Sequence, residues 1–429
     1  MSTREDTRAA ARPGGLRKNI AALYIVQIAN LALPLLSVPY LTRVLGVDSY
    51  GLLALAGALI VYFAAFTDFG FGATATRAAA AARGDRRQLG KLVAGVTLAR
   101  LGLLGISVLV LIVLVASIPR FTEYAEIYAA SAVSLLGTAL FPGWLLQGLE
   151  EMRTLASATV LGRAVCVLLL FVFVRGPDDV AVAAFIQSLA LLLSLALVAK
   201  PVLARVPMRY WRLDRQQIPA LLSDSKNAFV SSGAITMYTS AITLVLGLTS
   251  TAAAVGAFSA ASKIAVAFAS ILWAPISQGL YPRIAALVAN RNSRATEQLL
   301  SRVLRGLLPL AAVFTVGLWL VCEPLVRIVL GNGMEGAVPV LKALAGLPAL
   351  LVLSNFFGVL VLYAHGEFAA VSRLQIGAAL ISLLWLVPFT VFGAAEGAAW
   401  SALLTESLIT IGFIQLCRTR GLLRWARTS

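Results

Sequence analysis

The chain is a series of apolar stretches, each about long enough to cross a lipid bilayer as a helix. The hydrocarbon core takes roughly 20 apolar residues of helix per crossing, and a window of that width finds such segments throughout the 429 residues. The sequence therefore predicts an all-α polytopic membrane protein with about twelve spans. The expected spans are 19–41, 52–75, 92–117, 127–147, 155–174, 181–199, 227–248, 254–278, 302–322, 338–362, 374–392 and 397–416.

The composition supports this interpretation. Hydrophobic residues make up 60% and charged residues 13% of the chain, whereas about a quarter of an average soluble domain is charged. The net charge of +16 could suggest a nucleic-acid partner. However, the Lys and Arg residues lie in short loops between apolar helices, and no basic-aromatic module accompanies them, so we expect no nucleic-acid binding. Three widely separated cysteines imply neither a disulfide framework nor a zinc site.

The gaps between the spans alternate in charge. Lys and Arg concentrate in both tails and around residues 77–91, 200–226 and 283–305. The intervening gaps contain few basic residues, and carboxylates such as Asp48, Glu123 and Asp178 accompany them. Because basic loops remain in the cytoplasm, the pattern predicts that both termini are cytoplasmic.

One long polar segment divides the spans into two equal groups. It is basic and contains Tyr210 and Trp211, residues that favour the headgroup region, so we interpret it as an interfacial linker. The first apolar span is too long for a signal peptide and lacks a small-residue cleavage site. The expected organisation is a tail at 1–18, an N-terminal lobe at 19–200, the linker at 201–225, a C-terminal lobe at 226–416 and a tail at 417–429.

Short matching segments occur in the same order in both halves. Such an order indicates a parallel repeat related by a pseudo-two-fold axis along the membrane normal, with a binding site between the lobes. The matches are Lys18-Asn19 with Lys226-Asn227, Val44-Leu45-Gly46 with Val245-Leu246-Gly247, and Tyr50-Gly51 with Val255-Gly256.

Several longer motifs resemble those of a known transporter family. The most specific is Pro142-Gly143-Trp144-Leu145-Leu146-Gln147-Gly148-Leu149-Glu150-Glu151-Met152, at the end of the fourth span. Others are Leu41 to Gly46, Asp68 to Gly72 with Arg77, Val255 to Ile264, and Gly397 to Trp400 with Glu406. Together they resemble the Wzx-type polysaccharide flippases, which transport O-antigen and exopolysaccharide and belong to the multidrug/oligosaccharidyl-lipid/polysaccharide exporter superfamily.

The resemblance implies two lobes of about six helices around a cavity. It also implies a function, the transfer of undecaprenyl-pyrophosphate-linked oligosaccharide across the bacterial cytoplasmic membrane. A proton or sodium gradient would drive this transfer without a cofactor, and a polysaccharide polymerase or other assembly machinery is an expected partner alongside membrane lipids. A pyrophosphate with sugars cannot cross hydrocarbon unaided, because its polar groups would lose their water uncompensated.

Three cations lie deep inside predicted spans. Arg100, Arg163 and Lys263 are each about nine residues from a span end, or roughly 13 Å deep. A charged residue at the helix centre costs at least about 2.5 to 3.5 kcal/mol, so it usually faces a cavity or a partner. We expect the three to form a cationic chamber for the pyrophosphate. The alternative for each is an ion pair or a cap on the carbonyl groups of a broken helix.

Two carboxylates also lie within spans. Glu406 is about halfway along the last span, where a lone carboxylate should be protonated or paired. It could bind a coupling proton or sodium ion, or equally pair with a buried cation or a hydroxyl group. Asp68 lies nearer the cytoplasmic end, where a gate or a salt bridge with Arg77 or Arg100 is the expected role.

Other polar or helix-bending residues suggest hinges and sugar contacts. Pro34 and Pro39 should bend the first helix and free backbone carbonyl groups, which would make it a hinge for alternating access. Four further polar residues could bond to sugars, although packing between helices would explain each of them equally well. The candidates for hydrogen bonds to sugars are Asn227, Tyr238, Asn355 and Gln187.

Several other site types are not expected. The segment from Gly331 to Gly336 fits GxGxxG but lies in a loop without the βαβ context that a nucleotide site needs. The single His365 cannot form a metal cluster or a histidine-based catalytic pair. The alternatives to a flippase are a multidrug or cation antiporter of the same fold, a membrane-embedded glycosyltransferase or polymerase acting on the same lipid carrier, and a membrane scaffold.

Overall fold

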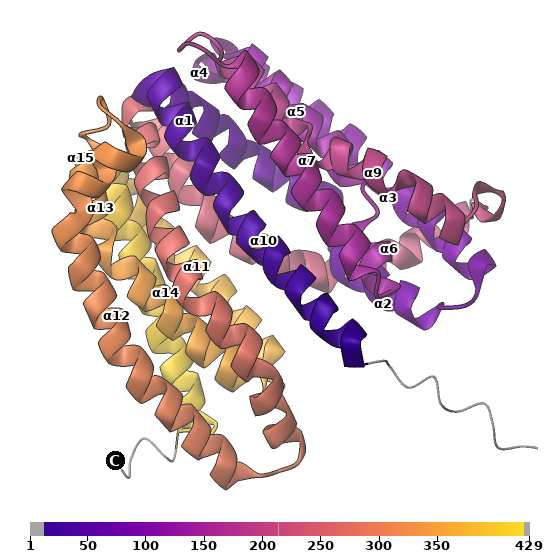
Figure 1. The fold of residues 1–429 in the computed structure, drawn as a ribbon. Helices are drawn as coiled ribbons and strands as arrows, with labels where there is room; N and C mark the ends of the chain where they lie inside the picture. The colour runs from indigo at the N-terminus through magenta and orange to yellow at the C-terminus, as the bar shows by residue number, and fades with distance from the viewer. Residues whose placement is uncertain (1–12, 213, 424–429) are drawn as a thin grey trace, which may run out of the picture.

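The computed structural model describes residues 13–212 and 214–423, and every regular element in these residues is helical (Figure 1). Nine helices in the described part are long and apolar enough to cross a membrane. The predicted all-α membrane architecture is confirmed. The count of twelve spans and the symmetry between the halves stay predictions.

The first half of the chain forms nine helices in the described residues. They are α1 (Pro13–Asp68), α2 (Phe71–Ala81), α3 (Arg86–Ser117), α4 (Pro119–Thr122), α5 (Ala125–Leu140), α6 (Gly143–Gly148), α7 (Met152–Phe173), α8 (Val180–Ser188) and α9 (Ala190–Arg205).

The second half is preceded by two short 3₁₀ turns and contains one π-helix, η4. The elements are η1 (Met208–Tyr210), η2 (Arg215–Gln217), α10 (Ile218–Thr249), α11 (Ala252–Ala289), α12 (Ser293–Leu330), α13 (Ala337–Ala343), η3 (Leu344–Gly346), α14 (Leu347–Asn355), η4 (Phe356–Tyr363) and α15 (Phe368–Thr419).

Single non-helical residues interrupt the two longest helices. Gly46 has φ 77° and ψ 176° within α1, and Ala394 has φ 44° and ψ −124° within α15. A positive φ ends regular helix, and glycine adopts it without the steric cost that a Cβ atom brings. Each long helix therefore consists of two segments, which explains why the sequence predicts two spans in each region.

The segment 201–225, predicted as the linker, contains the end of α9 and the start of α10. Helix α9 continues to Arg205 and α10 begins at Ile218, so the irregular segment lies between them. Within it, the indole N–H of Trp211 donates to the Val206 carbonyl at 3.0 Å. Apolar residues at the start of α10 extend the helix, and they pack against the core of the first half.

The halves share one apolar core and each has a core of its own. The shared core contains buried side chains from both halves, such as Leu45 and Leu135 with Leu246 and Leu330. A second core, around Leu145, lies in the first half with the start of α10 packed against it. A third core belongs to the second half. Figure 1 shows the resulting arrangement, in which the purple helices of the first half lie on one side of the molecule and the orange and yellow helices on the other.

We name the two ends of the molecule after residues in their turns. At the Gly46 end, Thr42 of α1 donates to the carbonyl of Leu330, the last residue of α12, at 3.0 Å. At the opposite, Arg83 end, the guanidinium of Arg83 donates to the Gly148 carbonyl at 2.8 Å. The indigo start of α1 and the yellow end of α15 both lie toward the Arg83 end (Figure 1). The halves are thus joined by direct hydrogen bonds at the Gly46 end.

Candidate functional site

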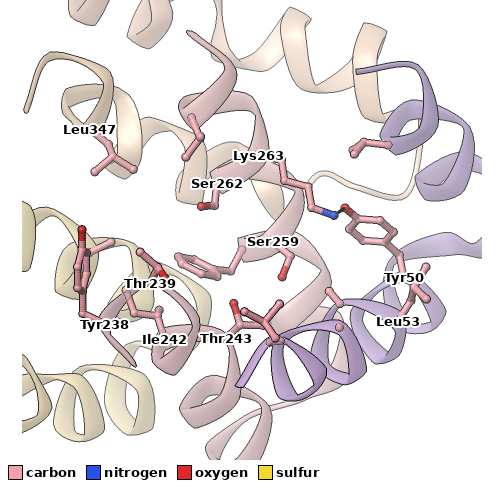
Figure 2. A pocket seen from close by; sticks show the side chains of 18 of the residues that line it. Tyr50, Leu53, Tyr238, Thr239, Ile242, Thr243, Ser259, Ser262, Lys263 and Leu347 are labelled. Carbon is pink, nitrogen blue, oxygen red and sulfur yellow. Dashed lines mark hydrogen bonds between the residues drawn. The ribbon is translucent and has the colours of Figure 1, made fainter. Parts of the chain in front are cut away.

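A cavity of about 430 Å³ lies between the two halves of the molecule. Its walls come from α1 and α8 of the first half and from α10, α11, α14 and α15 of the second. The lining combines apolar side chains with hydroxyl groups, among them Thr243, Ser259 and Ser262 (Figure 2). Apolar walls with a few polar groups are typical of a small-molecule site.

Two glycines bring α1 and α11 together between this cavity and the Gly46 end. A Cβ atom on Gly51 of α1 would lie 1.9 Å from the carbonyl oxygen of Ala252. On the facing helix, a Cβ atom on Gly256 would lie 2.1 Å from the carbonyl oxygen of Val47. Only glycine permits such close backbone contact. The contact is reciprocal, because Gly51 packs against the first turn of α11 and Gly256 against the start of the second segment of α1.

Lys263 is the cation that lines the cavity in the described residues. It lies on α11, and its ammonium group donates to the hydroxyl of Tyr50 on α1 at 2.9 Å (Figure 2). The same ammonium is 5.1 Å from the centre of the Tyr50 ring, within the range of a cation–π interaction. Tyr50 is only 1% exposed, whereas Lys263 is exposed to the cavity. The predicted cation therefore bridges the two halves.

Glu406 places a carboxyl group in the same cavity, from the second segment of α15. The residue is 5% exposed, and the hydroxyl of Ser354, near the end of α14, donates to its Oε1 atom. A buried carboxyl group needs such a partner. The structure therefore provides the hydroxyl partner that was one of the two interpretations of Glu406, and it leaves the carboxyl group facing the cavity.

Arg100 does not belong to the cavity lining. Its guanidinium forms an ion pair with Asp68 and donates to the carbonyl oxygens of Thr138 and Phe141, at 3.4 and 3.3 Å. These carbonyl groups lie at the break between α5 and α6. The expectation of a shared chamber is corrected for Arg100, because its side chain turns into the first half and not into the cavity. Asp68 also accepts from the Gly72 amide at 3.3 Å and so belongs to the α1–α2 turn.

The structure also keeps Arg163 apart from Lys263. Arg163 is exposed on α7 and does not line the cavity. Of the two proline positions expected to form a hinge, Pro39 lies in the first segment of α1, half-buried. Pro34 lies in the same helix, but its side chain falls outside the described residues.

Two of the four suggested sugar contacts lie at the cavity. Tyr238 and Gln187 are part of its lining. Asn227 is exposed near the start of α10, away from the lining. The side-chain amide of Asn355 donates to the Leu351 carbonyl at 2.7 Å, so its hydrogen bond lies within α14.

The sequence of α11 contains a periodic signal for its cavity face. Ser259, Ser262, Lys263 and Val266 all line the cavity, and their spacing of i, i+3, i+4 and i+7 marks one helical face. In the sequence, Tyr50, the partner of Lys263, stands out only as part of the repeat. Its role depends on contact between distant segments, which one sequence does not show.

A family comparison identifies the chain. Residues 16–288 match the model of the family described as "Polysaccharide biosynthesis protein". The chain belongs to this family. A protein of Escherichia coli (strain K12) named "Putative O-antigen transporter" is 34% identical over 95% of this chain and 98% of its own length. A protein of the same name from Shigella dysenteriae is 29% identical over 92% and 98% of the two chains.

Solved structures share the fold of this family member. The inward-facing conformation of a multidrug resistance MATE family transporter of the MOP superfamily superposes with a TM-score of 0.71, at 18% identity, over 94% of this chain and 96% of the other. The lipid II flippase MurJ in its inward closed conformation gives a TM-score of 0.65, at 14% identity, over 93% and 87% of the two chains. The similar proteins are named as transporters and a flippase, not as enzymes.

Proposed function

We propose that this protein is a flippase that moves undecaprenyl-pyrophosphate-linked oligosaccharide across the bacterial cytoplasmic membrane by ion-coupled alternating access. The polysaccharide biosynthesis family and the O-antigen transporters among its relatives support a lipid-linked glycan as the substrate. A polysaccharide polymerase or other assembly machinery would then receive the product on the outer side.

The position of Lys263 is the observation that carries the proposal. This residue brings a positive charge into a cavity that both halves line with hydroxyl groups. An ammonium can bind a phosphate as a point charge, and hydroxyl groups of Ser259, Ser262 and Thr243 can bond to sugars as donors or acceptors. Phosphate and sugar are the two parts of the substrate that hydrocarbon excludes.

The contacts at the Gly46 end support alternating access. Thr42 and Arg43 of the first half donate to the carbonyl oxygens of Leu330 and Ile328 of the second half. We take this end to face outward, because the basic loops belong to the Arg83 end. In this state the cavity would be closed toward the outside, and rotation of the halves would break these contacts.

Glu406 is our candidate for ion coupling. A buried carboxyl group beside a hydroxyl can take up a proton, or it can bind a sodium ion together with other oxygen ligands. Glu406 lines the same cavity as Lys263. Ion binding at Glu406 and substrate binding at Lys263 would therefore influence the same contacts between the halves.

Two rivals from the same membrane setting fit less well. An antiporter of organic cations would gain from an acidic cavity, but here Lys263 places a positive charge in it. A glycosyltransferase or polymerase would need reactive groups near its acceptor. The described cavity pairs its one carboxyl group, Glu406, with a hydroxyl from the same half.

Reconstitution in liposomes tests the proposal. A fluorescent undecaprenyl-pyrophosphate glycan is supplied on one side, and its appearance on the other is measured with imposed proton or sodium gradients. We expect Lys263→Ala to slow translocation by about tenfold or more, because a charge-assisted bond to phosphate is lost. Arg153→Ala, which removes an exposed arginine at the start of α7, is the control.

The outcomes separate the parts of the proposal. Translocation by Lys263→Ala at the wild-type rate would rule out this lysine as the phosphate ligand and leave a scaffold role open. Transport that no ion gradient affects would rule out secondary coupling. A wild-type protein that moves no glycan at all would overturn the flippase assignment.

A further inference from the structure

The one cation of the described cavity lining is already engaged across the interface between the halves. Lys263 of the second half donates to the hydroxyl of Tyr50 of the first half at 2.9 Å. The ring of Tyr50 also faces the ammonium at 5.1 Å. Both residues line the cavity (Figure 2). A ligand that binds Lys263 must therefore compete with Tyr50.

Tyr50 directly precedes the tight helix crossing at the Gly46 end. The next residue, Gly51, is the one that approaches Ala252 of α11. Lys263 lies seven residues after Gly256, about two helical turns further along α11. The Lys263–Tyr50 contact thus ties the same two helices together, two turns nearer the cavity.

The residues of the crossing itself do not line the cavity. The contacts of Gly51 and Gly256 are between backbones, and Thr42 donates to a backbone carbonyl of α12. None of these groups carries a charge, and Arg43, which donates to the Ile328 carbonyl at the same end, does not line the cavity. The Lys263–Tyr50 contact differs, because a ligand in the cavity can reach it.

We propose that the Lys263–Tyr50 contact is a latch that holds the Gly46 end closed while the cavity is empty, and that a pyrophosphate group releases it by taking Lys263. This inference rests on the proposed function for the identity of the releasing group, but the latch itself does not. Tyr50 is accordingly a positioning residue, since it acts through Lys263 and through the crossing beside it.

The chemistry favours such an exchange. A neutral phenol offers the ammonium one hydrogen bond and a ring face, whereas a pyrophosphate offers several charged oxygens. A ligand shifts a conformational equilibrium only through a difference in affinity between the two states. Here that difference arises because Lys263 is bonded to Tyr50 in the closed state, whereas in the open state its ammonium group is available to the ligand. The empty protein would then seldom open outward.

Distance measurement between the halves tests the latch. Spin labels at Glu126→Cys, in the first turn of α5, and at Asn332→Cys, after α12, report on the Gly46 end. Both residues are exposed, and the native Cys166, Cys322 and Cys417 are buried. Pulsed electron–electron double resonance on the full chain in lipid nanodiscs then gives the populations of short and long distances between the labels.

We expect Tyr50→Phe, without any ligand, to raise the ratio of long to short distances by about tenfold, because a hydrogen bond from a charged donor is lost only in the closed state. Lys263→Met should act in the same direction. Tyr281→Phe removes a hydroxyl from the same helix as Lys263, outside the cavity lining, and should leave the ratio unchanged. Unchanged distances in both Tyr50→Phe and Lys263→Met would overturn the latch.

The releasing group is tested separately. Undecaprenyl pyrophosphate should lengthen the distances in the wild type and have no further effect in Lys263→Met, whereas undecaprenol, which lacks phosphate, should have no effect. A response to undecaprenol equal to that of the pyrophosphate would overturn release through Lys263. If the latch variants open the protein but the liposome assay shows no glycan transport, the proposed function fails and the latch stands.

Discussion

The guanidinium of Arg100 and the carboxylate of Asp68 form an ion pair that fastens the end of α1 to the middle of α3. Arg100 is 4% exposed, and it also donates to two carbonyl groups at the break between α5 and α6. One side chain therefore joins three parts of the first half. The contacts of Arg100 therefore lie within the first half, whereas Lys263 faces the cavity between the halves.

Removal of Arg100 should destabilise the protein. Arg100→Ala leaves the Asp68 carboxylate without its cation and the Thr138 and Phe141 carbonyl groups without their donor, and we expect a loss of about 2 to 4 kcal/mol. Thermal unfolding in detergent measures it. The control, Arg153→Ala, removes an exposed charge and should cost less than about 1 kcal/mol.

A double-mutant cycle distinguishes the ion pair from other effects. Asp68→Asn combined with Arg100→Ala should cost less than the sum of the two single changes, because the contact is lost only once. Additive losses would show that the two side chains act independently. Arg100→Ala as stable as the wild type would contradict the structural role altogether.

The helices could be predicted from the sequence far better than the faces they present. A long run of apolar residues shows that a segment can span the bilayer, and from its length the depth of Arg100, Arg163 and Lys263 follows. Lipid and protein core are both apolar, so the sequence contrast between a buried and an exposed face is weak. Depth alone could not show that Arg100 turns into the first half while Lys263 faces the cavity.

The contacts between the halves were only partly predictable. The repeated order of Gly51 and Gly256 pointed to equivalent positions, but it did not show that each glycine packs on the other helix. Such a crossing joins residues about two hundred positions apart. Likewise, the bond from Ser354 to Glu406 needs the relative rotation of α14 and α15, which no local pattern in one sequence fixes.

The glycine crossing makes a prediction about the Gly46 end. Gly256→Ala adds a methyl group 2.1 Å from the Val47 carbonyl oxygen, where backbone must move, and such overpacking costs about 1 to 3 kcal/mol. The closed state should lose population, so the spin labels at Glu126→Cys and Asn332→Cys should report longer distances.

Gly279→Ala provides the matched control for this change. It adds the same methyl group to the same helix where nothing lies within 4 Å, and we expect unchanged distances. If Gly256→Ala leaves the distances as they are in the wild type, the crossing is not tight enough to limit opening.

Loss of the Glu406 carboxylate should make the translocation rate independent of the ion gradient. Glu406→Gln keeps the shape and can still accept a hydrogen bond from Ser354, but it cannot take up a proton or neutralise a cation. We expect gradient-driven translocation in liposomes to fall about tenfold or more, to the rate without a gradient. Ser354→Ala keeps the carboxylate and should retain a response to the gradient. A full response in Glu406→Gln would exclude this residue from coupling.

The linker should depend on a glycine in α3. A Cβ atom on Gly90 would lie 2.2 Å from the Tyr210 carbonyl oxygen, so Gly90→Ala should push the linker away from the first half. We expect faster cleavage by trypsin at the exposed Arg212 and a loss of about 1 to 3 kcal/mol. On the same helix, Gly102→Ala meets no atom within 4 Å and should digest like the wild type. Equal digestion of both variants would mean that the linker tolerates the added methyl group.

The orientation in the membrane can be tested with reporter fusions. Because basic loops stay in the cytoplasm, a fluorescent protein joined after Ser429 should fold and fluoresce inside the cell, and alkaline phosphatase joined there should be inactive. Phosphatase joined after Asn332, at the Gly46 end, should be active because it reaches the oxidising periplasm. A fusion after Arg291, in the turn between α11 and α12 at the opposite end, is the matched control and should be inactive. The reverse pattern would turn the molecule over in the membrane: the closed Gly46 end would face the cytoplasm, and the Lys263–Tyr50 contact would hold the inner side closed instead of the outer side.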